Sequence, residues 1–158
     1  MKTALIIFSM LAAAPAAAQV MAPAEYVNTA GASDLYERQS SQIVLQTTQD
    51  PKVRQFAQQM IAEHTTSTAD VKAAAARSRV PVAPPALMPA QAELIAQLRA
   101  ESGPARDAIY LAQQKASHNQ ALDVQKAYAM DGTAPALKAA AGKIVPVVES
   151  HIAMLKAM

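Results

Sequence analysis

Three histidines, His64, His118 and His151, are the residues whose type and spacing in this sequence best suit chemistry. Each lies in a different helical stretch and recurs with apolar residues at spacings of three and four, so we expect all three rings to face the protein interior. Buried imidazoles need polar partners. One shared metal ion would satisfy all three, because neutral imidazole binds zinc, copper and iron. The pattern predicts a metal site made of these three histidines.

Glu37 is the acidic residue that we expect to join the histidines as a fourth metal ligand. It follows Tyr36 on the side of the first helix that can face the interior. A solvated glutamate near a helix start is the open alternative. Glu63 and Glu149 lie one and two residues from a histidine, so their side chains should leave the helix in other directions. We expect both to be surface charges.

The identity of the metal follows from which motifs are present and absent. A carboxylate-bridged di-iron site needs Glu-x-x-His motifs, and none occurs here. Zinc or copper is therefore favoured over a di-iron centre. Met60 lies four residues before His64, and Met154 lies three after His151. Thioether sulfur on the same helix face as imidazole would suit copper, although methionine on an apolar face also serves simply as core.

Two other interpretations of the histidines stay open. In the first, the rings are hydrogen-bonded core residues of a structural or interaction module of the cell envelope. Stability would then fall as the pH drops through the histidine range, because buried neutral imidazoles must take up protons, and metals would change nothing. In the second, the protein is a small-molecule hydrolase or oxidase. That interpretation needs an open pocket, which the sequence does not reveal, so we assign no enzymatic activity and no catalytic residue.

The composition predicts that helices position these residues. Alanine and glutamine dominate, and only 4 of 158 residues are glycine, which is typical of an all-α protein. A short helix or turn over 22–31 should lead into a first helix that Ser33 caps and that ends near Thr48. Asp50 and Pro51 provide a cap and a first helical residue for a second helix that ends near Arg79.

The second half of the chain predicts a crossover and two more helical regions. Residues 79–89 contain four prolines and cannot be helical. A third helical region opens near Pro89, is interrupted at 102–104 and continues to Met130. The last helix follows a turn at 131–135, with Pro146 expected to kink it. Two helical hairpins joined by one long connection predict a ferritin-like four-helix bundle.

The first eighteen residues have the pattern of a secretory signal peptide. Lys2 precedes an apolar run and a small-residue end, which predicts cleavage after Ala18. The run is too short to span a bilayer, which takes about 20 apolar residues, and no later segment is long and apolar enough either. The chain has no cysteine, so disulfides and thiolate sites are excluded, and without a lipobox we expect a released protein rather than a lipid-anchored one. We expect a periplasmic protein whose residues 19–158 form a single four-helix-bundle domain.

The charge balance argues against nucleic acid as a partner. Lysine and arginine number 14 against 12 acidic residues, and the aromatic content is 4%. The net charge of +2 falls to +1 without Lys2, and the basic residues form no cluster. A metal ion or another envelope protein is the kind of partner that remains.

The sequence resembles a known family at the stretches AGASDLYERQSSQIVLQ, DPKVRQFAQQMIAEHT, RDAIYLAQQKASHNQAL and ALKAAAGKIVPVVESHIAML. They look like the bacterial exported domain-of-unknown-function family 4142, described as a ferritin-like bundle and sometimes as an outer membrane protein. The resemblance implies matching positions at Glu37, Val53, Phe56, Ala57, Met60, Glu63, His64, Tyr110, His118, Pro146 and His151. The chain departs from the family pattern with Glu63 in place of aspartate and with Arg106 before Asp107 in place of phenylalanine. The resemblance implies an exported helical bundle and no specific activity.

Overall fold

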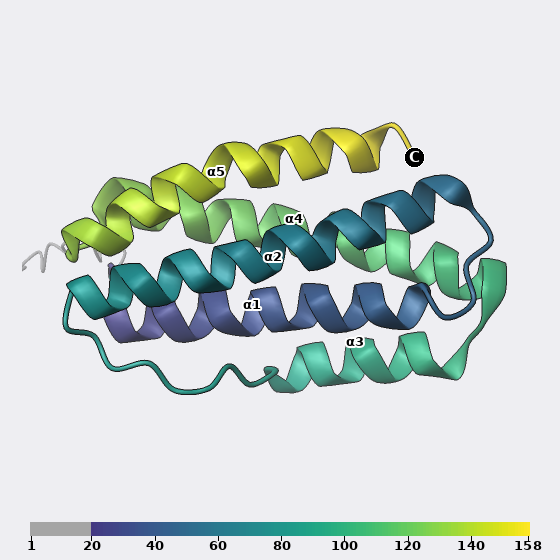
Figure 1. Cartoon of the computed structure of the whole chain (residues 1–158), viewed down its shortest axis with the longest axis horizontal. Helices are drawn as coiled ribbons and strands as arrows, with labels where there is room; N and C mark the ends of the chain where they lie inside the picture. Colours follow the sequence, from purple (N-terminus) through teal and green to yellow (C-terminus); the bar gives the residue numbers. More distant parts are fainter. Residues whose placement is uncertain (1–19) are drawn as a thin grey trace, which may run out of the picture.

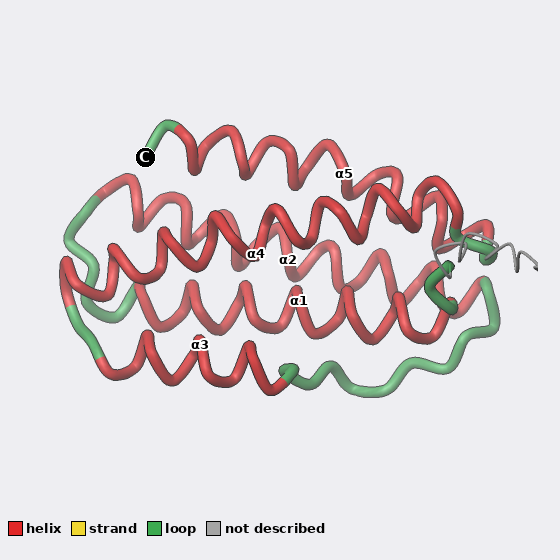
Figure 2. The backbone as a smooth tube through the Cα atoms, turned by 180° about the vertical axis from the view of Figure 1, so that it is seen from behind, coloured by secondary structure: helices red, strands yellow, loops and turns green. Residues whose placement is uncertain are grey.

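The computed structural model describes residues 20–158 as five α-helices with no strand among them (Figures 1 and 2). The helices are α1 (Pro23–Val44), α2 (Pro51–Arg77), α3 (Pro89–Ala100), α4 (Gly103–Asp131) and α5 (Pro135–Lys156). The all-α prediction is therefore confirmed. The predicted signal peptide, residues 1–18, lies outside the described residues. Between residues 20 and 158, none of the helices has the length and apolar character needed to cross a bilayer.

Four long helices form a bundle, and the shorter α3 flanks it (Figure 1). The pairs α1 with α2 and α4 with α5 are antiparallel hairpins. Residues 78–88 and α3 connect them, running along one side of the bundle (Figure 2). Because this connection returns the chain to the end where α2 began, α2 and α4 point the same way (Figure 1). The predicted bundle of two hairpins and one long crossover agrees with this arrangement.

The first helix is longer than predicted. Residues 22–31 are not a separate lead-in, and Ser33 is not an N-cap, because α1 runs without a break from Pro23 and ends at Val44 rather than Thr48. Gly31 suggested an interruption, yet a glycine within a helix costs only about 1 kcal/mol. Burial of Tyr26 and other apolar residues of the first turns against α2, α4 and α5 outweighs that cost.

The second helix begins as predicted. The carboxylate of Asp50 accepts hydrogen bonds from the backbone N–H groups of Lys52 and Val53, and Pro51 occupies the first helical position. The helix ends at Arg77, two residues before the predicted boundary. Arg79 has a left-handed φ of 55°, which turns the chain into the proline-rich crossover.

The interruption at 102–104 does more than break one helix. Gly103 adopts a φ of +54°, a conformation that favours glycine, and the chain reverses there. The predicted third helical region is thus two antiparallel helices, α3 and α4 (Figure 1). Ile95 and Leu98 of α3 join the apolar core, so the crossover contributes a fifth packed helix.

The core consists of two apolar clusters with polar residues between them. One cluster surrounds the stacked rings of Tyr26 and Tyr128, whose centroids lie 3.9 Å apart, and it joins the start of α1 to the end of α4. The other surrounds Phe56 and Tyr110 toward the opposite end of the bundle. The residues between the clusters along the helices include the three histidines and Asp34, and Glu37 follows Tyr36 at the edge of the second cluster; all five are buried. Polar groups therefore determine how the middle of the bundle packs.

Gly132 and Gly142 should respond in opposite ways to replacement by alanine. At Gly132 a Cβ atom would lie 2.5 Å from the carbonyl oxygen of Tyr128 and 2.6 Å from its ring. We expect Gly132→Ala to lower the free energy of unfolding by about 1–3 kcal/mol. At Gly142, exposed within α5, the nearest atom would be 4.0 Å away, so Gly142→Ala should raise it by up to about 1 kcal/mol. Thermal and urea unfolding check both, and equal effects would contradict this packing.

Candidate metal centre

The three histidines meet in the middle of the bundle. His64 comes from α2, His118 from α4 and His151 from α5, and they are 7%, 1% and 1% exposed. The ring centroids lie 5.7 Å apart for His64 with either of the other rings, and 5.2 Å apart for His118 with His151. The rings thus face the interior, as predicted, and form one group.

One nitrogen of each ring is held by an oxygen outside the group. His64 Nδ1 lies 2.8 Å from Asp34 Oδ1, and His118 Nδ1 lies 2.9 Å from the carbonyl oxygen of Gln114. His151 Nε2 bonds to Glu63 Oε2. A carbonyl or carboxylate oxygen accepts hydrogen bonds, so these three ring nitrogens carry the protons. In the neutral rings the other nitrogens then carry lone pairs.

Those other nitrogens, His64 Nε2, His118 Nε2 and His151 Nδ1, are buried and have no hydrogen-bond partner within residues 20–158. One nitrogen of each ring lies within 4.8 Å of its counterparts in the other two. Between three nitrogens at that spacing there is a position that lies about 2.8 Å or less from each of them. Metal–imidazole bonds of about 2.0–2.1 Å would need the rings to move inward by less than about 1 Å. Buried ring nitrogens that lie close together and have lone pairs suit a cation.

The electrostatics of the group favour neutral rings at two of the three positions. Burial lowers the pKa of His118 and of His151 below that of an ordinary histidine. Burial also disfavours the charged form of His64, but its hydrogen bond to Asp34 and the nearby charge of Glu37 outweigh burial and raise the pKa of His64. Neutral imidazole is the form that binds metals.

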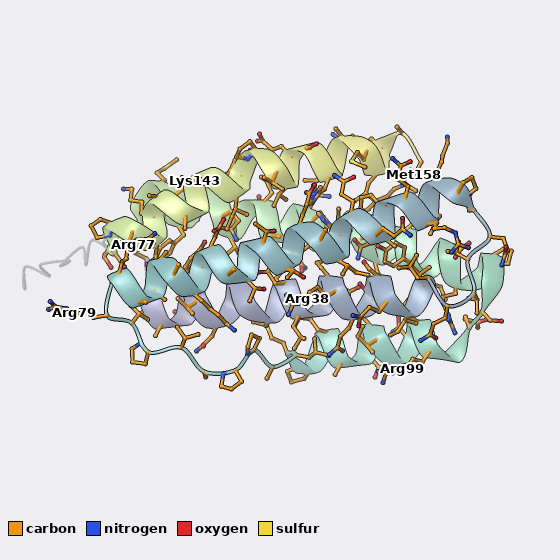
Figure 3. The ribbon with its side chains drawn as sticks, viewed as in Figure 1. Arg38, Arg77, Arg79, Arg99, Lys143 and Met158 are labelled. Atoms are coloured by element: carbon orange, nitrogen blue, oxygen red, sulfur yellow. The ribbon has the colours of Figure 1, made fainter. Side chains whose placement is uncertain are left out.

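Asp34 is a functional candidate that the sequence analysis missed. It is buried on α1, holds His64, and accepts a hydrogen bond from Thr68. Arg38, labelled in Figure 3, in turn donates to Thr68 and to the carbonyl oxygen of His64. With Ser33 predicted as an N-cap, Asp34 would lie in the first turn of the helix and was not considered as a site residue. Its spacing of three residues from Glu37, which places both on one helix face, was the available signal.

The prediction that Glu63 is a surface charge was right about its exposure and missed its bond to His151. Its side chain is 37% exposed and spans from α2 to α5, where it holds His151. Gln59 on the same helix fixes the other carboxylate oxygen at 2.8 Å. A glutamate side chain is long enough to reach a neighbouring helix even when its Cβ does not point toward that helix. Glu149, in contrast, pairs with Lys126 at the surface, as expected of a surface charge.

Glu37 is buried and faces the interior, but it stands beside the group of three nitrogens. Ser117 donates to its Oε1 at 2.7 Å, and the same oxygen lies 3.9 Å from His118 Nδ1, the nitrogen that Gln114 holds. The Oε2 atom has no partner within the described part of the chain. The structure does not bring Glu37 into the set of nitrogens within 4.8 Å of one another, so its role as a ligand stays a prediction.

A pocket of about 460 Å³ opens beside the histidines. Its walls come mainly from α2 and α5, with Asp34 of α1 and Gln125 of α4 at its inner side. His64 and His151 line it, whereas His118 does not. Two of the three imidazoles therefore border a space that leads outward, and the third lies behind them.

Comparison with known proteins gives a family and a fold. The family described as "Domain of unknown function (DUF4142)" matches residues 9–158. A search of curated proteins finds no match. The chain is similar in structure to a protein from Streptomyces coelicolor that is provisionally described as a secreted DUF305 protein, with a TM-score of 0.66 and 19% identity. The alignment covers 87% of this chain and 90% of the other, and at this identity it shows a shared fold.

Without metal, His118 and His64 should contribute to stability with opposite signs. His118→Leu removes a buried nitrogen that has no partner, and the Gln114 carbonyl remains within its helix. We expect the free energy of unfolding to rise by about 1 kcal/mol. His64→Leu deprives the buried Asp34 carboxylate of its imidazole partner and should lower stability by about 1–3 kcal/mol. Chelator-treated variants at neutral pH provide the test, and a large loss in His118→Leu would contradict it.

Proposed function

Since the chain belongs to the DUF4142 family, whose name specifies no activity, we propose from its own geometry that it binds one transition-metal ion through His64, His118 and His151. Two observations support this proposal: each ring has one buried nitrogen without a hydrogen-bond partner in residues 20–158, and one ligand atom from each ring lies within 4.8 Å of those of the other two. A hydrogen-bonded core would leave such nitrogens unsatisfied, at a cost of about 1–3 kcal/mol each. One ion removes that cost at all three positions.

The oxygens around the rings support the same proposal. Metal-binding histidines commonly donate their second N–H to a carboxylate or a backbone carbonyl, which fixes the ring and strengthens it as a ligand. Asp34, Gln114 and Glu63 hold the three rings in this way. The carboxylates, with Glu37, also give the site negative charge in a buried setting, where a cation is favoured.

Three imidazoles suit zinc or copper, and we propose one of these ions rather than a di-iron centre. Iron stays possible only as a mononuclear ion, since the Glu-x-x-His motifs of di-iron bundles are absent. A direct bond from Glu37 stays a separate prediction, which the site of three histidines does not require.

The proposed setting is the periplasm, where the protein would bind or buffer metal as a single domain after loss of residues 1–18. The pattern of that leader supports export. The alternative is an envelope module in which the histidines serve packing alone and another protein is the partner. Metal binding distinguishes the two.

Zinc, copper(II) and cobalt(II) titrations of the mature protein test the proposal directly. We expect one ion per chain and a higher unfolding midpoint, since free metal at 100 times Kd stabilises by about 2.7 kcal/mol. His118→Leu should abolish both effects while remaining folded. Elemental analysis and calorimetry provide the readouts. Unchanged melting of the wild-type protein with every ion would refute metal binding and favour the packing role.

Glu63 and Glu149 provide a matched pair for testing the support of His151. Glu63→Gln should weaken metal binding by about 10–100-fold while one ion per chain still binds, because a partner that orients a ligand is lost. Glu149→Gln, which affects only a surface pair with Lys126, should leave the affinity within about twofold of wild type. Competition with a chromophoric chelator measures both constants. Equal affinities for the two variants would show that Glu63 does not support the site.

A further inference from the structure

The proposed metal centre has three nitrogen ligands from the protein. Its fourth coordination position faces the pocket. Within residues 20–158, the set of mutually close ligand atoms consists of His64, His118 and His151 with no carboxylate. Structural zinc sites are closed by four protein ligands, whereas sites with three protein ligands leave a position for water or a substrate.

The residues that line the pocket indicate where this open coordination position lies. His64 and His151 both line it, and the fully buried His118 lies behind them. An ion held by all three rings has His118 on its inner side and the pocket on its outer side. The pocket volume of about 460 Å³ is far larger than the space that one water molecule needs. A ligand of several atoms therefore fits between the ion and the solvent.

The rings cannot easily turn to close this side. Each is fixed through its second nitrogen, by Asp34, Gln114 or Glu63. The two carboxylates that line the pocket beside the rings, Asp34 and Glu63, already accept these bonds. Neither is free to act as a fourth ligand without releasing its histidine.

One cationic side chain lines the pocket. Lys143, labelled on α5 in Figure 3, is exposed and shares the pocket wall with Pro146 and His151 of the same helix. Its charge thus lies at the wall of the pocket that His64 and His151 also line. Asp34, Glu63 and Asp70 also line the pocket, so Lys143 is the charge of its wall that attracts an anion against these carboxylates, and a neutral ligand does not respond to it.

We infer that a metal ion held by the three histidines keeps one coordination position open toward the α2–α5 pocket, and that this position exchanges small ligands with a nitrogen or oxygen donor. The inference rests on the proposed metal binding. It makes the centre an exchangeable binding site for a small molecule instead of a closed structural site.

Cobalt(II) reports an open position through its visible absorption. Azide, a small anion, and imidazole, a neutral ligand, should each change the spectrum of the cobalt-loaded mature chain and reach saturation. An unchanged spectrum at about 100 mM of either ligand, with one cobalt bound per chain, would overturn the open position and leave metal binding intact. A chain that takes up no cobalt, zinc or copper would instead refute the proposed function itself.

Two charge reversals on α5 test the route. At low ionic strength Lys143→Glu should raise the Kd for azide by about threefold or more, because an anion then passes a negative charge. Lys156→Glu, in the last turn of the same helix, should leave it within about 1.5-fold. Imidazole affinity should not respond to either change. Equal effects of the two reversals on azide would overturn the assignment of the pocket as the route.

Discussion

The requirement that buried lone pairs find a partner governs the middle of this bundle. An oxygen that can only accept a hydrogen bond fixes the tautomer of each histidine and leaves its other nitrogen with a lone pair aimed inward. Three such nitrogens are all acceptors, so they repel one another and attract a positive charge. The oxygens that face the outer nitrogens, in Asp34, Gln114 and Glu63, thus decide the chemistry of the inner ones.

The layout of the core follows from the same constraint. Apolar clusters around Tyr26 and Tyr128 at one end, and around Phe56 and Tyr110 toward the other, provide most of the burial. Between them lies a polar layer, made of the three histidines with Asp34 and Glu37. Hydrogen bonds such as those from Ser117 to Glu37 and from Thr68 to Asp34 satisfy part of it. A layer of this kind matches only one alignment of the four helices, whereas apolar side chains tolerate several. We see the polar layer as the element that fixes the register of the bundle.

Sequence periodicity was enough to find the histidines, because spacings of three and four place a residue on the buried face of its helix whatever the neighbours are. It was not enough to find the residues that hold them. The Cβ of Glu63 leaves its helix in a different direction from that of His64, but the length of the side chain brings its carboxylate to His151, 88 residues further along the chain. Asp34 was missed because Ser33 resembled an N-cap, although the packing of Tyr26 and Val27 extends the helix through it. The family resemblance implied a helical bundle and gave no information on these contacts.

The three histidines do not come from one half of the fold. His64 belongs to the first hairpin, and His118 and His151 belong to the second, which follows a crossover that a short turn could not replace. An ion bound by all three would join the two hairpins across a long loop, and the entropy lost by closing that loop in the unfolded chain is what a disulfide exploits. In a chain without cysteine, the ion would serve as the staple between the two halves, one that chelation removes and that reducing agents leave intact.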